Sequence, residues 1–156
     1  MALPPGSGLD LGLACDLRIA AERAKLAEAF VSMGLIPDGG GTYFLPRLVG
    51  TARAAELTLL GKSLSPAEAL QMGLINKVVP NSELEKAILD WAEALANGPS
   101  VAIGLAKRGL GKNLSEDIGS ALREEAESQK ICLRSQDHKE AVQAYLEKRA
   151  PVFQGK

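Results

Sequence analysis

The stretch GLIPDGGGTYFLPRLVG, residues 34–50, places one carboxylate, that of Asp38, between a proline and three consecutive glycines. Proline, aspartate and glycine in succession are typical of a turn, and the aspartate of such a turn can cap the helix that follows it. Capping would make Asp38 a poor base. An apolar pocket formed by Phe30, Leu35 and Ile36 would instead favour its protonated form and suit it to acid–base catalysis. The residues alone leave both interpretations open.

The composition is that of a globular protein and excludes several classes of partner. The chain has 156 residues, of which 46% are hydrophobic and 24% charged, so one domain with a sizeable core is expected. Lysine and arginine number 18 against 19 acidic residues, and the net charge is -1. Because this balance gives no overall positive charge, we expect neither a nucleic acid nor a membrane as partner, and local basic patches stay open at this point.

The cysteines and the single histidine argue against a disulfide framework and a metal site. Cys15 and Cys132 lie far apart and form no C-x-x-C motif, which favours free thiols in a reducing compartment, and we expect the cytoplasm. No targeting signal is visible in residues 1–8, and no stretch approaches the roughly 20 apolar residues of a membrane helix. His138, the only histidine, follows an aspartate in a polar stretch, which indicates a surface position. We therefore expect no metal.

The first half of the chain mixes helix and strand signals. Residues 6–20 predict a glycine turn, a short helix and a strand around 17–20. Residues 25–30 predict another strand, and two helices are expected from 42 to 60. Ser65 as N-cap, Glu68 closing a capping box and Gly73 after the last turn mark a further helix. Residues 74–80 predict a short strand.

The second half predicts helices only. Ser82 and Glu85 have the spacing of a second capping box, and further helices are expected at 101–110, 116–133 and 138–148. We therefore divide the chain into a mixed α/β region, residues 1–80, and an all-helical region, residues 81–156. These helices are amphipathic, so they need either the sheet of their own chain or another subunit to pack on.

The turn formed by Gly6, Ser7 and Gly8 is the first candidate for chemistry. Backbone N–H groups at a helix start favour negative charge, so a developing oxyanion could lie there, although a plain tight turn explains the same residues. Gly12 comes one residue too late for a dinucleotide-binding motif. Asp10 lies in the first turn of the helix, where the dipole favours a carboxylate with or without another role.

Three stretches carry a more specific signal together than any of these motifs alone. They are GSGLDLGLACDLRIAAERAKLAEAF (6–30), GLIPDGGGTYFLPRLVGTARAAELTLLGKSLSPAEALQMGLINKVVP (34–80) and AYLEKRAPVFQG (144–155). Their order and spacing resemble the enoyl-CoA hydratase/isomerase, or crotonase, superfamily. They are most similar to its enoyl-CoA isomerases, including the ring-epoxide isomerase of phenylacetyl-CoA breakdown. The resemblance implies an α/β spiral of ββα turns followed by helices that mediate trimerisation, in homotrimers or hexamers.

The resemblance also implies a substrate and residue roles. The ligands would be acyl-CoA thioesters, with no cofactor beyond the coenzyme A of the substrate. The backbone N–H of Ser7 would be one of two donors to the thioester oxygen, and one such donor contributes roughly 2.7–4 kcal/mol. The two catalytic glutamates of hydratases align with Asp10 and with Phe30. Phe30 cannot act as an acid or a base and would only contact the substrate.

Asp38 falls where several enoyl-CoA isomerases of this superfamily carry their acid/base. A single carboxylate can remove a proton at one carbon and return it two carbons along while the oxyanion hole holds the dienolate. Tyr145 and Lys148, three residues apart on a predicted helix face, match the aromatic and basic positions that reach coenzyme A in relatives. The resemblance therefore implies an enoyl-CoA isomerase with Asp38 as proton shuttle.

Two alternatives stay open at this point. A hydratase could use Asp10 and Asp38 as its pair of carboxylates. Alternatively, the chain could form a non-catalytic assembly, because relatives have roughly a hundred more residues before the GSG turn. By the resemblance the chain corresponds to the C-terminal portion of the family's domain and lacks the second oxyanion donor. Loss of that donor would leave the isolated chain nearly inactive.

Overall fold

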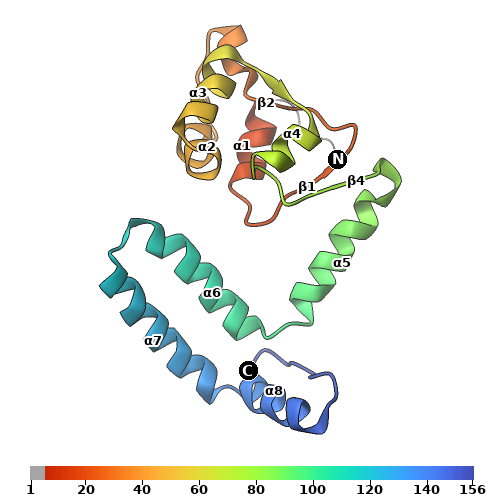
Figure 1. Cartoon of the computed structure of the whole chain (residues 1–156), viewed down its shortest axis with the longest axis vertical. Coiled ribbons are helices and arrows are strands. Elements are labelled where there is room, and N and C mark those ends of the chain that lie inside the picture. Colours follow the sequence, from red (N-terminus) through yellow and green to blue (C-terminus); the bar gives the residue numbers. More distant parts are fainter. Residues whose placement is uncertain (1–5) are drawn as a thin grey trace. The chain divides into compact units, whose positions relative to one another are not determined.

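The computed structural model describes residues 6–156 and divides the chain into two units (Figure 1). One unit ends at Ile88 and the other is Leu89–Lys156. The division falls within helix α5 (Leu84–Ala96), eight residues after the division at residue 80 that we placed from the sequence. Each unit is described by itself below. In the part of the chain that the structure describes, no helix is both long and apolar enough to cross a membrane.

The first unit has an α/β architecture with two small sheets. Strand β1 pairs in parallel with β4, with Ile19 opposite Lys77, and β2 pairs antiparallel with β3, with Leu26 opposite Leu64. Its elements in chain order are α1 (Ser7–Leu13), β1 (Ile19–Ala21), β2 (Leu26–Ala27), the 3-10 helix η1 (Ala29–Met33), α2 (Gly41–Val49), α3 (Thr51–Leu60), β3 (Ser63–Leu64), α4 (Pro66–Gln71), β4 (Lys77–Val79) and the 3-10 helix η2 (Asn81–Glu83). The mixed α/β prediction is confirmed, and β3 was not predicted.

Local capping explains where α4 begins and ends. The Ser65 hydroxyl accepts the backbone N–H of Glu68 at 3.3 Å, and the Glu68 carboxylate accepts the backbone N–H of Ser65 at 2.8 Å. Pro66 takes the first helical position, and Gly73 has a φ of 76° just after the helix. The predicted capping box is therefore confirmed, with the glycine supplying a backbone conformation that other residues rarely adopt.

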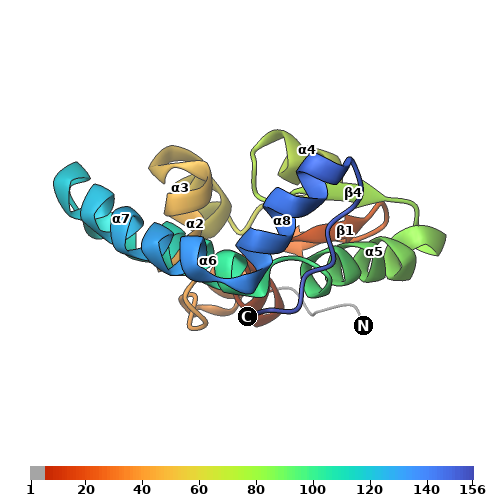
Figure 2. The same cartoon turned by 90° about the horizontal axis from the view of Figure 1, so that it is seen from below.

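The core of the first unit lies between the helices and the small sheets. Its main apolar cluster consists of Leu13, Ala20, Leu45, Val49, Ala54, Leu57, Leu64, Ala69, Leu74 and Ile75. Arg18, just before β1, connects this strand to the segment before β4. The Arg18 side chain donates to the carbonyl of Leu74 at 2.6 Å, and Asn76 exchanges hydrogen bonds with the Arg18 backbone at 2.8 and 2.9 Å. These hydrogen bonds help to hold the start of β1 next to the start of β4, and the two strands lie side by side in Figure 2.

The second unit is helical, as predicted. Its elements are most of α5, then α6 (Ser100–Lys112), the 3-10 helix η3 (Asn113–Ser115), α7 (Ile118–Arg134) and α8 (Gln136–Glu147). Helix α5 starts directly after η2, so Ser82 lies inside a 3-10 turn and the second predicted capping box is wrong. Asp117 caps α7 by accepting the backbone N–H groups of Gly119 and Ser120.

Helices α6 and α7 bury none of their own residues. Several large apolar side chains on them are more than half exposed, among them Leu110, Ile118 and Leu122 at 77, 76 and 57%. Amphipathic helices gain most of their stability by covering such a face. These exposed side chains agree with the expectation that the helices pack on another surface, and the identity of that surface stays a prediction.

Candidate active site

Helix α1 starts at a turn that only glycine forms without strain. Gly6, its N-cap, has φ 83° and ψ −116°; its N–H donates to the Ala27 carbonyl at 2.8 Å, which links the turn to β2. A Cβ at Gly6 would lie 3.3 Å from the ring of Phe30. Ser7 is the first residue of the helix and is exposed. Its backbone N–H is therefore one of the helix-start donors that lack an intrahelical acceptor.

Phe30 lies beneath this turn. Its ring is 4% exposed and packs against Gly6. Phe30 therefore supports the turn in the described chain, and its predicted contact with substrate stays a prediction.

Asp10 joins the two glycine motifs of the sequence. Its side chain is fully buried, and its Oδ2 accepts the backbone N–H of Gly39 at 2.9 Å. The glycine loop packs tightly against the Asp10 side chain. A Cβ at Gly39 would lie 2.7 Å from Cβ of Asp10, and a Cβ at Gly41 would collide with its Oδ1. Glycines at both positions allow the loop to approach the carboxylate. The structure therefore brings Asp10 and the loop of Asp38 together.

Glu28, which sequence reasoning missed, is the second buried carboxyl of this region. It is 1% exposed and lies within hydrogen-bonding reach of Asp10. Burial, followed by the charge and the hydrogen bond of Asp10, raises the pKa of Glu28 to about 8. Its one sequence signal is an acidic residue between apolar ones in the predicted strand LAEAF.

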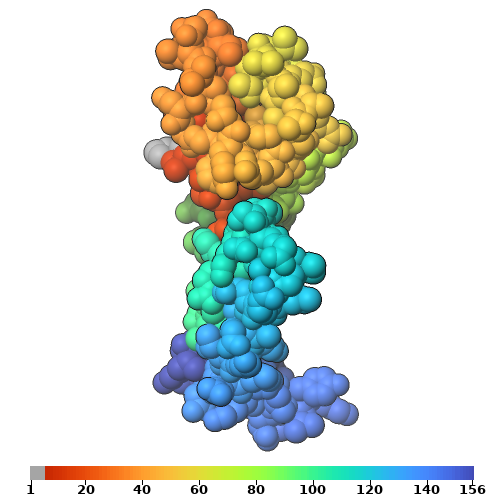
Figure 3. All heavy atoms as spheres, turned by 90° about the vertical axis from the view of Figure 1, so that its left-hand side faces the viewer, coloured from red at the N-terminus to blue at the C-terminus, as the bar shows by residue number. Residues whose placement is uncertain are grey.

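Asp38 is exposed and makes no hydrogen bond or ion pair within residues 6–156. Helix α2 is capped by Gly40, with φ 98° and no side-chain hydrogen bond, so the capping interpretation of Asp38 is wrong. Leu35 and Ile36 are 55 and 76% exposed, so in the described chain they do not enclose Asp38 in an apolar pocket. The segment before α2, orange in Figure 3, lies at the surface of its unit.

Tyr145 and Lys148 belong to the second unit. Tyr145 lies on α8 and is 83% exposed. Helix α8 ends at Glu147, and Lys148 is its C-cap in the left-handed conformation, with φ 56°. Because the backbone turns there, the prediction that these two side chains share a helix face is wrong. Their proposed contact with coenzyme A is a separate matter and stays a prediction.

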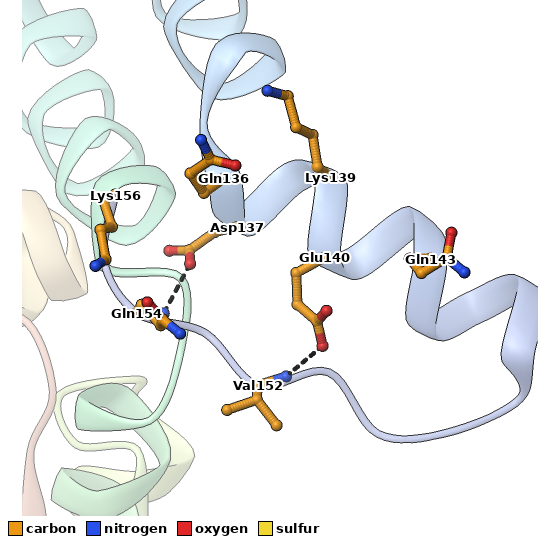
Figure 4. Close-up of a pocket in the computed structure, with 8 residues that line it drawn as sticks. All are labelled: Gln136, Asp137, Lys139, Glu140, Gln143, Val152, Gln154 and Lys156. Atoms are coloured by element: carbon orange, nitrogen blue, oxygen red, sulfur yellow. Dashed lines mark hydrogen bonds between the residues drawn. The ribbon is translucent and has the colours of Figure 1, made fainter.

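A polar pocket lies between α8 and the C-terminal residues of the second unit. Asp137 and Glu140 point from α8 toward this segment (Figure 4), where they accept the backbone N–H groups of Gln154 at 2.7 Å and Val152 at 2.9 Å. Neither Tyr145 nor Lys148 lines this pocket. The pocket is therefore built around structural hydrogen bonds of the chain end.

No group of three or more histidine, cysteine, aspartate or glutamate side chains within residues 6–156 is arranged to hold a metal ion. The candidate chemistry of the first unit consists of carboxyl groups, a helix start and glycine backbone.

Comparison with known proteins identifies relatives along nearly the whole chain. A model of the enoyl-CoA hydratase/isomerase family matches residues 3–156. The 1,2-epoxyphenylacetyl-CoA isomerase of Escherichia coli K12 is 41% identical over 151 residues, which are 97% of this chain and 58% of that protein. The short-chain-enoyl-CoA hydratase of Clostridium acetobutylicum is 36% identical over 144 residues, or 92% of this chain and 55% of that protein.

A solved structure shows the same fold. The crystal structure of an enoyl-CoA hydratase from Bacillus anthracis superposes with a TM-score of 0.93 at 38% identity, covering 97% of this chain and 59% of that one. The chain thus spans less than two thirds of the length of these relatives. Their names include both a hydratase and an isomerase, so the names alone do not select one reaction.

Proposed function

The chain belongs to the enoyl-CoA hydratase/isomerase family. From this premise we propose that it acts as an enoyl-CoA isomerase in which Asp38 is the acid/base. The ligand class is an acyl-CoA thioester. The observation that carries the proposal is the state of Asp38: exposed, next to three glycines and without a partner among the described residues. A carboxylate in this state is free to meet a substrate.

The proposed reaction needs one proton shuttle. The Asp38 carboxylate removes a proton from C2 of a 3-enoyl-CoA, and the electron pair spreads into a dienolate. The protonated Asp38 then returns the proton to C4, which leaves the double bond between C2 and C3. The N–H of Ser7, at the start of α1, would donate to the thioester oxygen while it carries negative charge.

The hydratase alternative finds less support. It requires Asp10 as one of two carboxylates that position and activate water. Asp10 is fully buried, and its Oδ2 is already bonded to the loop. The carboxylate therefore serves the loop in the described chain. The closeness of Asp38 to Asp10 along this loop is the one feature that a hydratase would also use.

Self-association and coenzyme A contacts complete the proposal. The exposed apolar side chains of α6 and α7 support packing of the helical region in a homotrimer or hexamer. Tyr145, exposed on α8, can stack on an aromatic ring such as adenine, and the ammonium of Lys148 can contact a phosphate. Both roles are proposals that follow from the family.

The test is turnover by this 156-residue chain of a 3-enoyl-CoA, followed by the appearance of the conjugated 2-enoyl thioester, with hydration of a 2-enoyl-CoA assayed in parallel. We expect slow isomerisation without hydration, because the N–H of Ser7 is the one oxyanion donor that the proposal assigns. Hydration as the main activity would support the two-carboxylate alternative instead. No turnover in either assay would contradict activity of this chain and favour the non-catalytic assembly.

A further inference from the structure

We propose that Glu28 is a positioning residue that keeps its proton, donates it to Oδ1 of Asp10, and so helps Asp10 hold the glycine loop that carries Asp38. The loop's link to catalysis rests on the proposed function. The shared proton and its effect on the loop do not.

The hydrogen bonds around the two carboxyls favour such a proton. Oδ2 of Asp10 accepts the N–H of Gly39, but Oδ1 of Asp10 and both carboxyl oxygens of Glu28 are buried without a partner among the described residues. A buried oxygen that loses its hydrogen bond to water without replacement destabilises the fold. One proton between the two carboxyls supplies the missing donor, with the O–H of Glu28 facing Oδ1 of Asp10.

The charges around the pair favour the same state. Charged groups on the packed or adjacent elements include Arg47 of α2, which packs against α1, Arg53 and Glu56 of α3, which packs against η1, Lys25 before β2, and Asp38 of the loop. All of them are exposed. Burial, followed by the negative charge of Asp10, raises the pKa of Glu28 to about 8. Two carboxylates in contact cannot both ionise without a strong mutual penalty. The pair therefore carries one negative charge at neutral pH.

The loop follows the carboxyl of Asp10 closely. Added Cβ atoms at Gly39 and Gly41 would both meet this carboxyl group, so the loop backbone packs directly on it. Asp38 immediately precedes Gly39. A second negative charge on the pair would push the carboxyls apart and displace the residues next to Asp38.

The pairing has a definite pH signature. The folded-state pKa of Glu28, about 8, lies above its ordinary value of 4.5, so between these values the folded chain holds a proton that the unfolded chain has released. Stability is therefore fully present below about pH 4.5 and falls as pH rises toward 8. One proton of difference changes the unfolding equilibrium constant about tenfold per pH unit.

The first experiment measures urea unfolding of the full chain from pH 5 to pH 9 for the wild type, Glu28→Gln and the control Glu22→Gln. The glutamine at position 28 keeps a donor for Asp10 but does not titrate. We expect it to lose the downward slope and to be more stable than the wild type at pH 8. Glu22 is exposed on the same segment, so its variant should keep the wild-type slope. An equal slope in Glu28→Gln, or no slope in the wild type, overturns the proposal.

The second experiment follows the loop, and its decisive readout comes from the wild type. The amide resonance of Gly39 in the wild type should shift with a midpoint near pH 8, and in Glu28→Gln it should not shift in this range. A Gly39 amide that is constant to pH 9 in the wild type overturns the positioning role. Isomerisation measured in parallel separates the two proposals: an inactive chain with a titrating Gly39 contradicts the proposed function and supports the pair.

Discussion

Buried carboxyl groups occur in both units of this protein, and they are stabilised in opposite ways. In the second unit Asp137, 3% exposed, accepts two backbone N–H groups, those of Gln154 and Gly155. In the first unit Asp10 accepts one backbone N–H, and its other neighbour is the carboxyl of Glu28. A carboxylate surrounded by donors is a structural anchor, whereas two facing carboxyls must retain a proton.

The number of hydrogen-bond donors around a carboxyl group distinguishes Asp137 from Asp10, whereas burial does not. Asp137 and Asp10 are both buried, yet the Asp137 site is complete and the Asp10 site lacks a donor unless Glu28 keeps its proton. Asp38 represents a third state, since it is exposed and unpartnered in the described chain. Substitutions in the two units can therefore test the comparison directly.

The largest effect is expected from Asp38→Asn. Removal of a positioned acid/base lowers the rate by roughly 10²–10⁴-fold, so kcat for 3-enoyl-CoA isomerisation should fall by that factor. Because Asp38 is exposed, the free energy of unfolding should change by no more than about 0.5 kcal/mol. Both quantities are measured on the same preparation, and full activity of the variant would exclude Asp38 as the shuttle.

The same change in the other unit, Asp137→Asn, should do the reverse. Asparagine offers one acceptor oxygen, and its amide would face the second backbone N–H. We expect a loss of about 3 kcal/mol of stability. Hydrogen exchange should show faster exchange at Gln154 and Gly155. Unchanged protection of these amides would mean that the Asp137 carboxylate does not anchor the chain end.

A smaller effect should follow from Gly41→Ala, with Gly12→Ala as its matched control. The added methyl at position 41 would collide with Oδ1 of Asp10 and should cost about 2 kcal/mol, as overpacking does. At Gly12 no atom lies within 4 Å of an added Cβ, so alanine in this helix should stabilise by about 0.5–1 kcal/mol. Thermal unfolding of both variants measures the difference, and equal effects would contradict the close packing of the loop on Asp10.

The smallest expected effect is an acid response confined to the second unit. The hydrogen bond from Arg149, followed by that from the Val152 N–H, lowers the pKa of Glu140 to about 2 from its usual 4.5. This contribution to stability is present above pH 4.5 and is lost as pH falls through 2. The Val152 amide resonance should therefore titrate in acid, whereas that of Gly39 should titrate near pH 8. Movement of both amides in the same pH range would contradict the comparison.

Patterns within a few residues were predictable, and contacts across the fold were not. The capping box of Ser65 and Glu68 is a local pattern, so the sequence shows it. Strand β3 has only two residues and too little periodicity to recognise. The left-handed Lys148 has no sequence signal, because that conformation is usual only for glycine and asparagine.

The candidate site shows the same limit. Asp10 and Gly39 are 29 positions apart, and their contact depends on how α1 packs beside the loop before α2. The proposed role of Glu28 depends on its contact with Asp10, which lies on another element. The resemblance to the family singled out Asp38 as acid/base, which stays a prediction, but it gave no sign that the carboxyls of Asp10 and Glu28 lie close together.

The most direct test of the central claim, that one carboxylate carries the proton, follows deuterium from a 3-enoyl-CoA labelled at C2 and isomerised in ordinary water. The account predicts that a measurable fraction of the 2-enoyl product carries the label at C4, because Asp38 returns the hydron it removed. A product with only solvent hydrogen at C4 would contradict it.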